Sequence, residues 1–319
     1  KKMSTRAYTD RLVMIEPAAF RFNEQTAVNN YYQQVLDGMD ASQAQSNALQ
    51  EFNDFVIKLR EVGVHVTVIK DTLDSDTPDS IFPNNWVSFH EDGTVGLFPM
   101  FAENRRTERR MDILEKLKEN GARIERVADM SAYEDKGHFL EGTGSIVLDR
   151  HERVAYAALS QRTNQHLFLE FCSQFGYTPV IFTAYQDVEG ERKAIYHTNV
   201  MMCIADHFAV ICLDCIDDMH ERHEVIEMLE ESNKEIIEIS EEQVQHFAGN
   251  MLQVGPQGKP VLVMSKAAFD ALDEYQIAAI EKHCPILSSS LDTIEACGGG
   301  SARCMMAEDF LPYDKTEKS

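Results

Sequence analysis

The segment at residues 297–306, with the sequence CGGGSARCMM, ends in a candidate nucleophile. Three consecutive glycines add nothing to packing and cost conformational entropy, so they usually indicate backbone that passes close to another group. Cys304 follows them, directly after Arg303, and a nearby positive charge would stabilise its thiolate. A loop that leads into a buried structural cysteine explains the same pattern equally well.

Two other segments contain groups that could move the proton of such a cysteine. His197, in YHTN at 196–199, precedes an apolar run; its imidazole, with an ordinary pKa of about 6.5, could take a proton and return it to a leaving amine. Glu141, in FLEGTG at 139–144, could orient a histidine as a partly buried carboxylate. A hydrogen-bonded structural histidine and an acid in a turn are the alternatives.

Polar side chains in two more segments could bind a substrate. Residues 79–86, with the sequence DSIFPNNW, contain Asp79, Asn84 and Asn85 just before a predicted strand, where two asparagines are also common in a plain turn. Arg162, in SQRTN at 160–164, begins a predicted helix, and its guanidinium could hold a substrate carboxylate through two hydrogen bonds. A surface salt bridge is the alternative for Arg162.

The composition argues against several other classes of protein. The 319 residues contain 30 basic and 53 acidic side chains, a formal net charge of −23, which disfavours binding to nucleic acid or to anionic membranes. No apolar run approaches the length of a membrane span, no secretory signal is recognisable, and no nucleotide-binding glycine motif follows a strand. Of the seven cysteines only Cys212 and Cys215 form a close pair, so we expect reduced thiols, no metal and a cytoplasmic protein.

Short apolar strands alternate with amphipathic helices, and no linker divides the chain, so we expect a single domain over 1–319. A strand, strand, helix, strand pattern recurs four or five times at spacings of about 50 to 60 residues, which indicates repeated units arranged about a centre. A doubly wound sheet is the second choice. The predicted strands are 64–69, 86–89, 95–98, 122–127, 145–148, 153–158, 178–183, 200–204, 207–213, 234–238, 251–254 and 260–264, with further short strands to about residue 306; the predicted helices are 24–61, 105–120, 163–175, 217–231 and 266–283.

Taken together, these segments resemble the guanidino-group-modifying superfamily, the pentein fold of arginine deiminases, dimethylarginine dimethylaminohydrolases and amidinotransferases. The resemblance runs in order from residue 79 to residue 304. It is carried by LEGxG at 140–144, SxRTNQ at 160–165, NRRxE at 104–108 and the glycine run before RCM at 303–305. It implies an α/β fold, a five-bladed pseudosymmetric propeller of repeated ββαβ-type units, in agreement with the recurrence in the sequence.

The resemblance also implies roles for individual residues. Cys304 corresponds to the nucleophile and His197 to the general acid and base. Glu141 corresponds to the acid that supports the histidine and contacts the terminal nitrogens of the substrate. Arg162 and Arg105 correspond to the arginines that bind the substrate carboxylate, with the arginine at position 106 as the alternative to Arg105.

The sequence departs from the superfamily at the positions that hold the guanidinium, which are Asp79, Asn84 and Asn85. Members that act on a guanidinium cation have carboxylates in the place of these asparagines, and deiminases also have an aspartate in the place of Asn199. Amides remove the counter-charges that a buried cation needs, whereas their donor and acceptor suit a neutral ureido group. Citrulline carries such a group, and the pattern also resembles the citrulline-utilisation hydrolases, a bacterial branch of the superfamily.

We therefore expect a cysteine hydrolase that cleaves a C–N bond of an arginine-like amino acid without metal or organic cofactor, with citrulline as first choice, giving ornithine and carbamate. An arginine deiminase-like, dimethylarginine-hydrolysing or succinylarginine dihydrolase-like enzyme is the alternative, as is an amidinotransferase. A non-catalytic propeller of the translation-factor type, which binds protein or the ribosome, is the alternative from another class. The expected partner is a small-molecule amino acid, with no nucleic acid or membrane, and a homodimer is compatible with the sequence.

Overall fold

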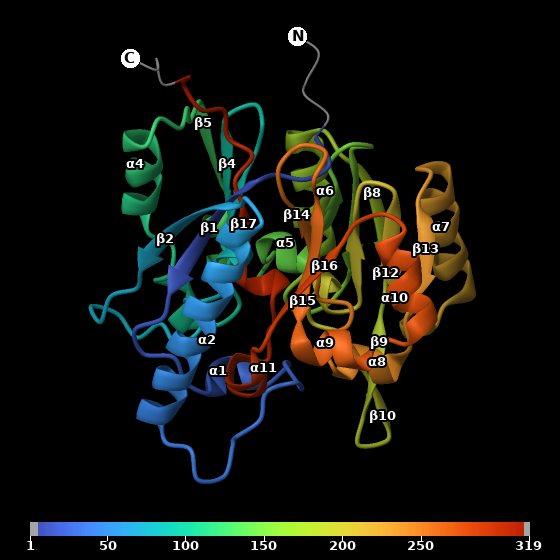
Figure 1. The fold of residues 1–319 in the computed structure, drawn as a ribbon, viewed down its shortest axis with the longest axis horizontal. Helices are drawn as coiled ribbons and strands as arrows, with labels where there is room; N and C mark the ends of the chain where they lie inside the picture. Colours follow the sequence, from blue (N-terminus) through green and yellow to red (C-terminus); the bar gives the residue numbers. More distant parts are fainter. Residues whose placement is uncertain (1–5, 316–319) are drawn as a thin grey trace.

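Five small three-stranded sheets form the core of the computed structural model, which describes residues 6–315 (Figure 1). In every sheet the first two strands pair antiparallel and the last two pair parallel. In strand order the sheets are β17 (Ala307–Glu308), β1 (Arg11–Glu16) and β2 (His65–Lys70); β3 (Val87–Phe89), β4 (Thr94–Leu97) and β5 (Arg126–Asp129); β6 (Val147–Asp149), β7 (Val154–Ala158) and β8 (Thr178–Phe182); β11 (Met202–Ile204), β12 (Phe208–Ile211) and β13 (Glu235–Glu238); and β14 (Leu252–Val254), β15 (Val261–Ser265) and β16 (Ile286–Ser289). A separate hairpin, β9 (Tyr185–Val188) and β10 (Glu191–Ala194), projects from the body of the protein (Figure 1).

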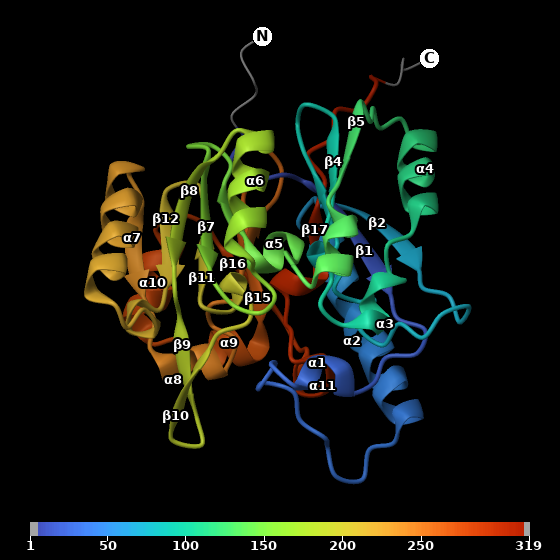
Figure 2. The same cartoon turned by 180° about the vertical axis from the view of Figure 1, so that it is seen from behind.

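Helices connect the two parallel strands of each sheet, since parallel neighbours need a crossover connection. The connecting helices are α2 (Ala41–Glu61), α4 (Met111–Glu119), α6 (Gln165–Phe175), α7 (Met219–Glu231) and the pair α9 (Lys266–Ala271) and α10 (Glu274–Glu281). Figure 2 shows α4 and α7 on opposite flanks of the molecule. Within residues 6–315, none of the helices is both long and apolar enough to span a lipid bilayer.

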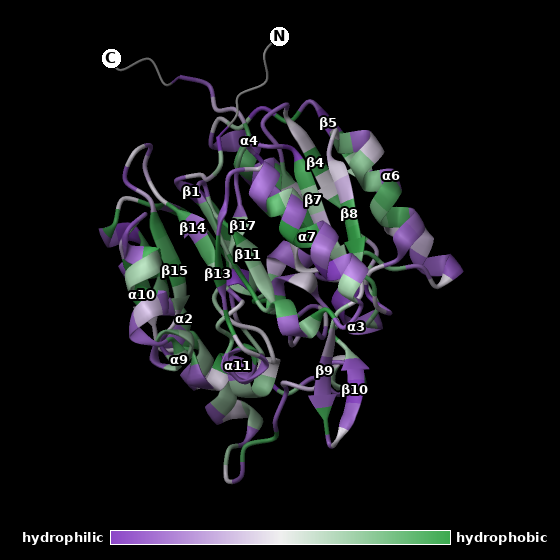
Figure 3. Ribbon diagram, turned by 90° about the vertical axis from the view of Figure 1, so that its right-hand side faces the viewer, coloured by the Kyte–Doolittle hydropathy of each residue, from purple (hydrophilic) through white to green (hydrophobic). Residues whose placement is uncertain are grey.

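The central strands of the sheets are buried on both faces, which explains why they lack polar alternation. Every residue of β7 and of β15 is buried, and their sequences VAYAA and VLVMS are almost continuously apolar or small. Figure 3 shows β15 in the colour of hydrophobic residues and most of the β9–β10 hairpin in that of hydrophilic ones. The apolar strands thus lie inside the protein, beneath amphipathic helices.

This recurrence confirms the expected mixed α/β architecture of repeated strand, strand, helix, strand units. The units that begin at β3, β6, β11 and β14 are continuous in sequence, whereas β17 returns to pair with β1 and completes the remaining sheet. Neighbouring sheets meet through their first strands, because β17 contacts β3 and β11 contacts both β6 and β14. Closure of the sheets into a five-bladed propeller stays a prediction, as does the single domain over 1–319.

The predicted helix over 24–61 is wrong in its first part. The chain forms one turn, α1 (Glu24–Ala27), and then continues without helix or strand until α2. Asp40 begins α2 with a capping box, in which its side chain accepts from the amide of Gln43 and the side chain of Gln43 accepts from the amide of Asp40. The stretch before Asp40 instead covers the cavity described below.

Several other boundaries differ from the prediction. The helix predicted over 105–120 divides into α3 (Glu103–Arg106) and α4. The helix predicted over 266–283 divides at Leu272, whose backbone is extended, and Asp273 caps α10 anew. The strand predicted at 122–127 forms only from 126 to 129, as β5. The elements that were not predicted are β1, β9, β10, α5 (Gly142–Ser145), α8 (Glu241–Gln245) and α11 (Asp292–Gly298).

A short turn or helical turn precedes the first strand of each sheet, and several of these turns meet in the middle of the fold. They are Pro83–Asn85 before β3, α5 before β6, Thr198–Val200 before β11, residues 246–249 before β14 and Arg303–Met305 before β17. The turn at Pro83–Asn85 contacts both α5 and the turn at Arg303–Met305, and α5 also contacts the turn at Thr198–Val200. The predicted site residues in segments 79–86, 138–145, 196–199 and 297–306 lie in or beside these turns.

Candidate active site

A small cavity lined by buried residues lies where the turns meet; the space free of protein atoms, counted together with its opening to solvent, is about 250 Å³. Its wall is formed by Thr26, Asn30, Asp79, Phe82, Asn85, Arg105, Arg162, Tyr196, His197, Gly298, Gly299, Gly300 and Cys304. All of these residues are buried. The cavity therefore brings together six residues that the sequence analysis selected, from segments far apart in the chain.

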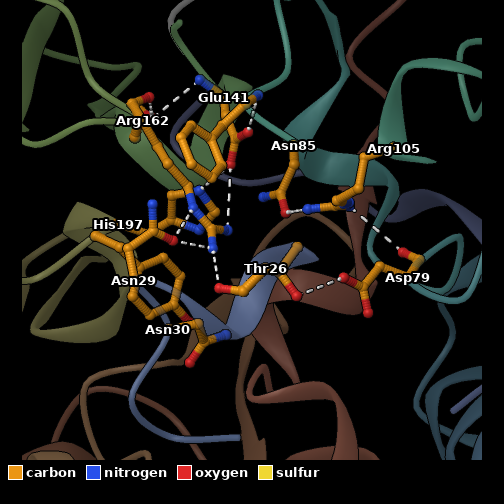
Figure 4. A network of polar contacts seen from close by, with 12 residues as sticks. Thr26, Asn29, Asn30, Asp79, Asn85, Arg105, Glu141, Arg162 and His197 are labelled. Atoms are coloured by element: carbon orange, nitrogen blue, oxygen red, sulfur yellow. Dashed lines mark hydrogen bonds and ion pairs between the residues drawn. The ribbon is translucent and has the colours of Figure 1, made fainter. Parts of the chain in front are cut away.

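Glu141 holds the imidazole of His197 in one orientation (Figure 4). Its Oε1 lies 2.7 Å from Nε2 of His197, and its Oε2 accepts a hydrogen bond of 2.8 Å from the amide of Phe101. An ionised carboxylate can only accept, so we assign the proton to Nε2 and a free lone pair to Nδ1. The imidazole is therefore arranged to accept a proton at Nδ1.

Burial dominates the electrostatics of this pair. It lowers the pKa of His197 to about 4, although the hydrogen bond and the negative charge of Glu141 act in the opposite direction. Burial alone would raise the pKa of Glu141, but the charge of Arg162 and the hydrogen bond to His197 outweigh it and hold that pKa at about 2. At neutral pH the pair is thus a carboxylate and a neutral imidazole, the form that can act as a base.

The sulfur of Cys304 lies against two carboxamides. Nδ2 of Asn250 is 3.4 Å from Sγ, and Nδ2 of Asn199 is 3.6 Å from it. The cysteine is 3% exposed and faces the same cavity as His197. All seven cysteines are free thiols, so Cys304 is available as a nucleophile.

Glycine is required at several positions by the close approach of other residues. A Cβ at Gly144 would lie 2.5 Å from Nδ2 of Asn85 and 2.9 Å from Nδ1 of His197. In the glycine run before Cys304, a Cβ at Gly298 would lie 2.9 Å from the ring of Phe82. The run thus passes close to another group, as its sequence indicates, and both glycine segments let backbone pack against the site.

We expect Gly144→Ala to lower kcat by at least about 100-fold, because the added methyl group displaces either His197 or Asn85 from its position. The measurement is kcat together with the midpoint of thermal unfolding, which separates loss of the site from loss of the fold. A folded variant with unchanged kcat would contradict the close packing of these side chains around the cavity.

A cover segment, residues 23–36, closes the cavity on one side (Figure 4). Arg162 donates from Nε to Oδ1 of Asn29 at 2.8 Å and from Nη2 to the carbonyl of Thr26 at 2.9 Å. Asn30 donates to the carbonyl of Gly299 at 3.2 Å, which ties the segment to the glycine run. Neutral oxygens of the cover segment therefore occupy the donors of Arg162 that could bind a carboxylate.

Arg105 already has a buried partner. Its guanidinium donates to the two carboxylate oxygens of Glu108 at 2.9 and 3.0 Å, and its Nη1 donates to Oδ1 of Asn85 at 2.7 Å. Nδ2 of Asn85 donates to Oδ1 of Asn84 at 2.8 Å. Asn85 therefore has a defined orientation, with its oxygen toward Arg105 and its amide nitrogen toward Asn84.

Asp79 contributes an unpaired carboxylate oxygen to the wall. Its Oδ2 accepts from Nδ2 of Asn23 at 2.9 Å and from the hydroxyl of Thr26 at 3.3 Å, whereas its Oδ1 is buried without a partner. Burial raises the pKa of Asp79, against the charge of Arg105. A buried acceptor without a donor is costly, so a ligand that brings an N–H group would stabilise this oxygen.

Some residues selected from the sequence do not reach the wall. The guanidinium of Arg303 donates to the carbonyl of Met306 and to Glu308, away from the cavity. Asn84 lies behind Asn85, and Asn199 reaches the site only through its contact with the sulfur. The side chain at position 106 donates to the carbonyls of residues 100 and 101, so the arginine at position 105 is the one that faces the cavity.

Four residues of the site were not selected from the sequence: Thr26, Asn30, Tyr196 and Asn250. The hydroxyl of Tyr196 donates to the carbonyl of Gly299 at 2.7 Å, and the guanidinium of Arg162 lies 4.7 Å from the centre of its ring. Tyr196 directly precedes His197 and could have been found from that position. The only signal for Asn250 is a glycine before it, which is typical of a tight turn.

Solved structures with the same fold were found by comparison. The N-terminal domain of ArgZ, in a variant covalently bound to a reaction intermediate, matches with a TM-score of 0.71 and 18% identity, over 95% of this chain and 99% of that one. Complete ArgZ, an arginine dihydrolase from the ornithine-ammonia cycle in cyanobacteria, matches with a TM-score of 0.72 and 17% identity. The match extends over 96% of this chain but only 41% of the ArgZ chain. A dimethylarginine dimethylaminohydrolase variant in adduct with S-methyl-L-thiocitrulline matches with a TM-score of 0.63 and 15% identity, over 94% of this chain and 99% of that one. At such identities the similarity shows the fold alone.

The sequence itself matches a family profile. No curated protein matches it as a relative. The profile described as "N,N dimethylarginine dimethylhydrolase, eukaryotic" matches residues 16–311, a range that contains every residue of the cavity wall. Together with the shared fold, this match confirms the resemblance to the guanidino-group-modifying enzymes of the pentein superfamily. The chain therefore belongs to the N,N dimethylarginine dimethylhydrolase family of the eukaryotic type.

Proposed function

We propose that this chain is a cysteine-dependent hydrolase of a C–N bond in the terminal group of an arginine-like amino acid, and that citrulline is its substrate. The observation that supports this most directly is that Cys304, His197 and Asn85 face one buried cavity. A thiol, a neutral imidazole and a carboxamide in one cavity provide a nucleophile, a base and a polar group that can recognise the substrate. The family assignment supports the same class of hydrolase.

The charges around the cavity suit an amino acid with an uncharged tip. Arg105 is held by both oxygens of Glu108 at 2.9 and 3.0 Å, whereas Arg162 approaches a carboxylate, that of Glu141, only at 3.5 Å. Arg162 is therefore the cation that can bind the α-carboxylate once the cover segment moves aside. The unpaired Oδ1 of Asp79 is the matching acceptor for the α-ammonium group. Glu141 already pairs with His197 and Arg162. If Asp79 binds the α-ammonium group, little negative charge therefore remains to balance a second cation, the guanidinium.

Asn85 supports recognition of the ureido group. Its Oδ1 accepts from Arg105 and one hydrogen of its Nδ2 is donated to Asn84, so the second hydrogen of Nδ2 is available for a ligand. That N–H can donate to the carbonyl oxygen of citrulline. An aspartate in this position would offer acceptors only, which suit the N–H groups of a guanidinium.

The reaction begins when Cys304 transfers its proton to Nδ1 of His197 and the sulfur attacks the ureido carbon. The bond from that carbon to the δ-nitrogen breaks, its electron pair remains on the nitrogen, and the imidazolium returns the proton to it. Ornithine is thereby released as an amine. A carbamoyl group remains on the sulfur as a thiocarbamate.

Water completes the reaction. His197 takes a proton from a water molecule, and the resulting hydroxide attacks the thiocarbamate carbon. The C–S bond breaks, the thiolate recovers its proton from the imidazolium, and carbamic acid leaves. The acid ionises to carbamate in solution and decays to ammonia and carbon dioxide. Each cycle therefore consumes one water in the enzyme and restores both Cys304 and His197.

Arginine is the second candidate substrate. ArgZ, which shares the fold, is described as an arginine dihydrolase, and AgrE, another protein of the same fold, has a solved complex with L-arginine. Conversion of arginine to ornithine by way of citrulline, with ammonia as the other nitrogen product, hydrolyses two C–N bonds in succession, and the second hydrolysis is the citrulline step proposed above. The two candidates therefore differ in whether the guanidinium is accepted first.

Product analysis distinguishes the candidates. The purified enzyme is expected to release ornithine and ammonia in equal amounts from citrulline and neither from arginine. Twice as much ammonia as ornithine from arginine would favour the second candidate, and conversion of arginine to citrulline with citrulline left intact would contradict the proposal. In the matched variant Asn85→Asp, loss of the N–H donor is expected to lower kcat/KM for citrulline by at least about tenfold.

The pH dependence of kcat/KM tests the state of the imidazole. Because burial lowers the pKa of His197 to about 4, we expect kcat/KM for citrulline to fall on the acid side with a midpoint near pH 4. Between about pH 6.5 and 4, His197 is protonated in the unfolded chain but not in the folded one, so the free energy of unfolding also falls as the pH falls through this range. Circular dichroism at each pH is needed to show that the enzyme is still folded. A midpoint near the ordinary histidine value of about 6.5 would contradict the buried, neutral base.

We also propose that the five sheets close around the cavity as the blades of one propeller. The contacts of β17 with β3 and of β11 with β6 and β14 support this arrangement, as do the turns that meet at the cavity. A crystal structure of the full chain tests it, since an open edge between two neighbouring sheets would contradict closure. A homodimer stays a prediction.

A further inference from the structure

We propose that Asn250 is a further catalytic residue, which acts with Asn199 as a pair of carboxamide donors that stabilises the thiolate of Cys304. The inference rests on the proposed role of Cys304 as nucleophile but not on the identity of the substrate. Nδ2 of Asn250 lies 3.4 Å from Sγ, and Nδ2 of Asn199 lies 3.6 Å from it. Oδ1 of Asn199 lies farther away, at 4.0 Å, where it accepts from the thiol before the proton is transferred. Both asparagines are 1% exposed, so water does not compete for the sulfur at these positions.

The hydrogen bonds of Asn250 determine which end of its carboxamide faces the sulfur. Its Oδ1 accepts from the backbone amide of Arg303 at 3.1 Å, and its Nδ2 donates to the backbone carbonyl of Asn199 at 2.9 Å. Exchange of the oxygen and the nitrogen would oppose acceptor to acceptor and donor to donor at both contacts. One hydrogen of Nδ2 is thus used by the carbonyl, and the other is directed toward Sγ.

The turn before Asn250 is shaped to bring this side chain to the sulfur. A Cβ at Gly249 would lie 2.3 Å from the carbonyl oxygen of Val200, so only glycine lets this turn pack against the turn of Asn199. Phe247 has φ of 64°, an unfavourable conformation for a residue with a side chain. The energetic cost of this backbone conformation at Phe247 is consistent with a turn whose shape is needed for function.

Asn250 also occupies the same place in its unit as known residues of the wall occupy in theirs. It stands two residues before β14, as Asn85 stands two residues before β3. Cys304 and Asn199 likewise lie in the turns that lead into β17 and β11. The sheet of β14, which contributes no wall residue of its own, therefore reaches the site through Asn250.

Within residues 6–315, Asn199 and Asn250 are the only side chains that donate a hydrogen bond to this sulfur. The guanidinium of Arg303, expected from the sequence to stabilise the sulfur, is directed to Glu308 and to the carbonyl of Met306. Burial lowers the pKa of His197 to about 4, so no imidazolium lies beside the thiol before its proton is transferred. A buried anion needs hydrogen bonds or a counter-charge, and two amide N–H groups meet that need without adding a charge beside a neutral ureido group.

Asn250 makes and breaks no covalent bond in the reaction. It stabilises the negative charge on Sγ after the proton has moved to His197, and again when the C–S bond breaks and the thiolate is released. Its contact with the amide of Arg303 also fixes the backbone next to Cys304. The two contacts predict different effects, which an experiment can separate.

The variant Asn250→Asp separates them, because aspartate keeps the shape and the acceptor for the amide of Arg303. A negative oxygen then replaces the nitrogen that donates to the sulfur and to the carbonyl of Asn199. The thiolate of Cys304 is titrated by its ultraviolet absorbance, with the Cys304→Ser protein subtracted as the reference. The apparent pKa of the thiol is expected to rise by at least about one unit. For citrulline, kcat is expected to fall by at least about 100-fold with KM changed by less than about threefold.

Asn164→Asp is the matched control, since Asn164 caps α6 outside the cavity and aspartate caps equally well. It is expected to leave both the thiol titration and kcat unchanged. Asn250→Ser removes the donor without adding a charge and is expected to raise the thiol pKa by less than Asn250→Asp does. It tests the proposal if the aspartate variant does not fold. An unchanged thiol pKa in folded Asn250 variants would overturn the proposal whether or not kcat falls. A raised pKa in a protein that does not hydrolyse citrulline would support it while contradicting the substrate.

Discussion

Cys304→Ala is expected to lower kcat for citrulline by at least about 10⁴-fold, because the sulfur forms the covalent bond through which the reaction proceeds. The fold should persist, since the removed atom touches only the amide groups of Asn199 and Asn250 among its hydrogen-bond partners. The midpoint of thermal unfolding is expected to change by only a few degrees, about 4 °C or less. The measurement is a progress curve of ornithine release from both proteins at the same concentration.

Cys297→Ala is the control for this prediction. Cys297 is the other cysteine beside the glycine run, but it lies in α11 and does not line the cavity. Burial raises the pKa of its thiol, which makes it a poorer nucleophile. Activity that survives in Cys304→Ala and disappears in Cys297→Ala would transfer the nucleophile to residue 297.

Glu141→Gln is expected to lower kcat by about 100- to 1000-fold, through His197 rather than through contact with the nucleophile. Glutamine has one acceptor where glutamate uses two, toward His197 and toward the amide of Phe101. If its oxygen faces His197, its amino group opposes the N–H of Phe101 and the imidazolium loses a negative partner. If its amino group faces His197, the proton is forced onto Nδ1, the atom that must accept the proton of the thiol.

The pH dependence of kcat/KM distinguishes an effect on His197 from a purely structural effect, which would not shift its acid limb. Glu141 raises the pKa of His197 against burial, so in the glutamine variant the acid limb of kcat/KM is expected to move further below pH 4. Glu134→Gln is the matched control, because Glu134 also accepts from a backbone amide, that of Met100, and also pairs with an arginine, Arg109, outside the cavity. Equal losses of kcat in the two variants would show that the effect is on folding and not on the imidazole.

Much of the fold could be predicted because each repeated unit has a similar pattern of apolar residues. Fully buried central strands such as β7 and β15 leave apolar runs, and Asn164 and Asp218 mark where α6 and α7 begin. The error over 24–61 has a physical cause. Apolar side chains at positions 28, 31, 32, 35, 36 and 39 have the three- and four-residue spacing of a helix face. Tertiary contacts with Arg162 and Gly299 nevertheless hold this stretch over the cavity.

The site could be predicted only where a motif is contiguous in sequence. Cys304, His197 and Glu141 each stand beside glycines or in a recognisable segment, and the structure brings all three together. Arg303 was selected because it is next to Cys304 in the chain, but successive side chains of a 3-10 turn point in different directions, and its guanidinium lies with Glu308. Asn250 reaches the sulfur by tertiary packing alone, which no local pattern reveals.

The central claim is that a thiolate at residue 304 takes a carbamoyl group from an uncharged ureido side chain while ornithine departs. The direct measurement is the mass of the acid-quenched protein, and of its peptide containing Cys304, within the first turnovers on citrulline. We expect an adduct with the mass of a carbamoyl group alone, located on Cys304. An adduct that retains the whole amino-acid skeleton, or one that forms with arginine and never with citrulline, would contradict the central claim.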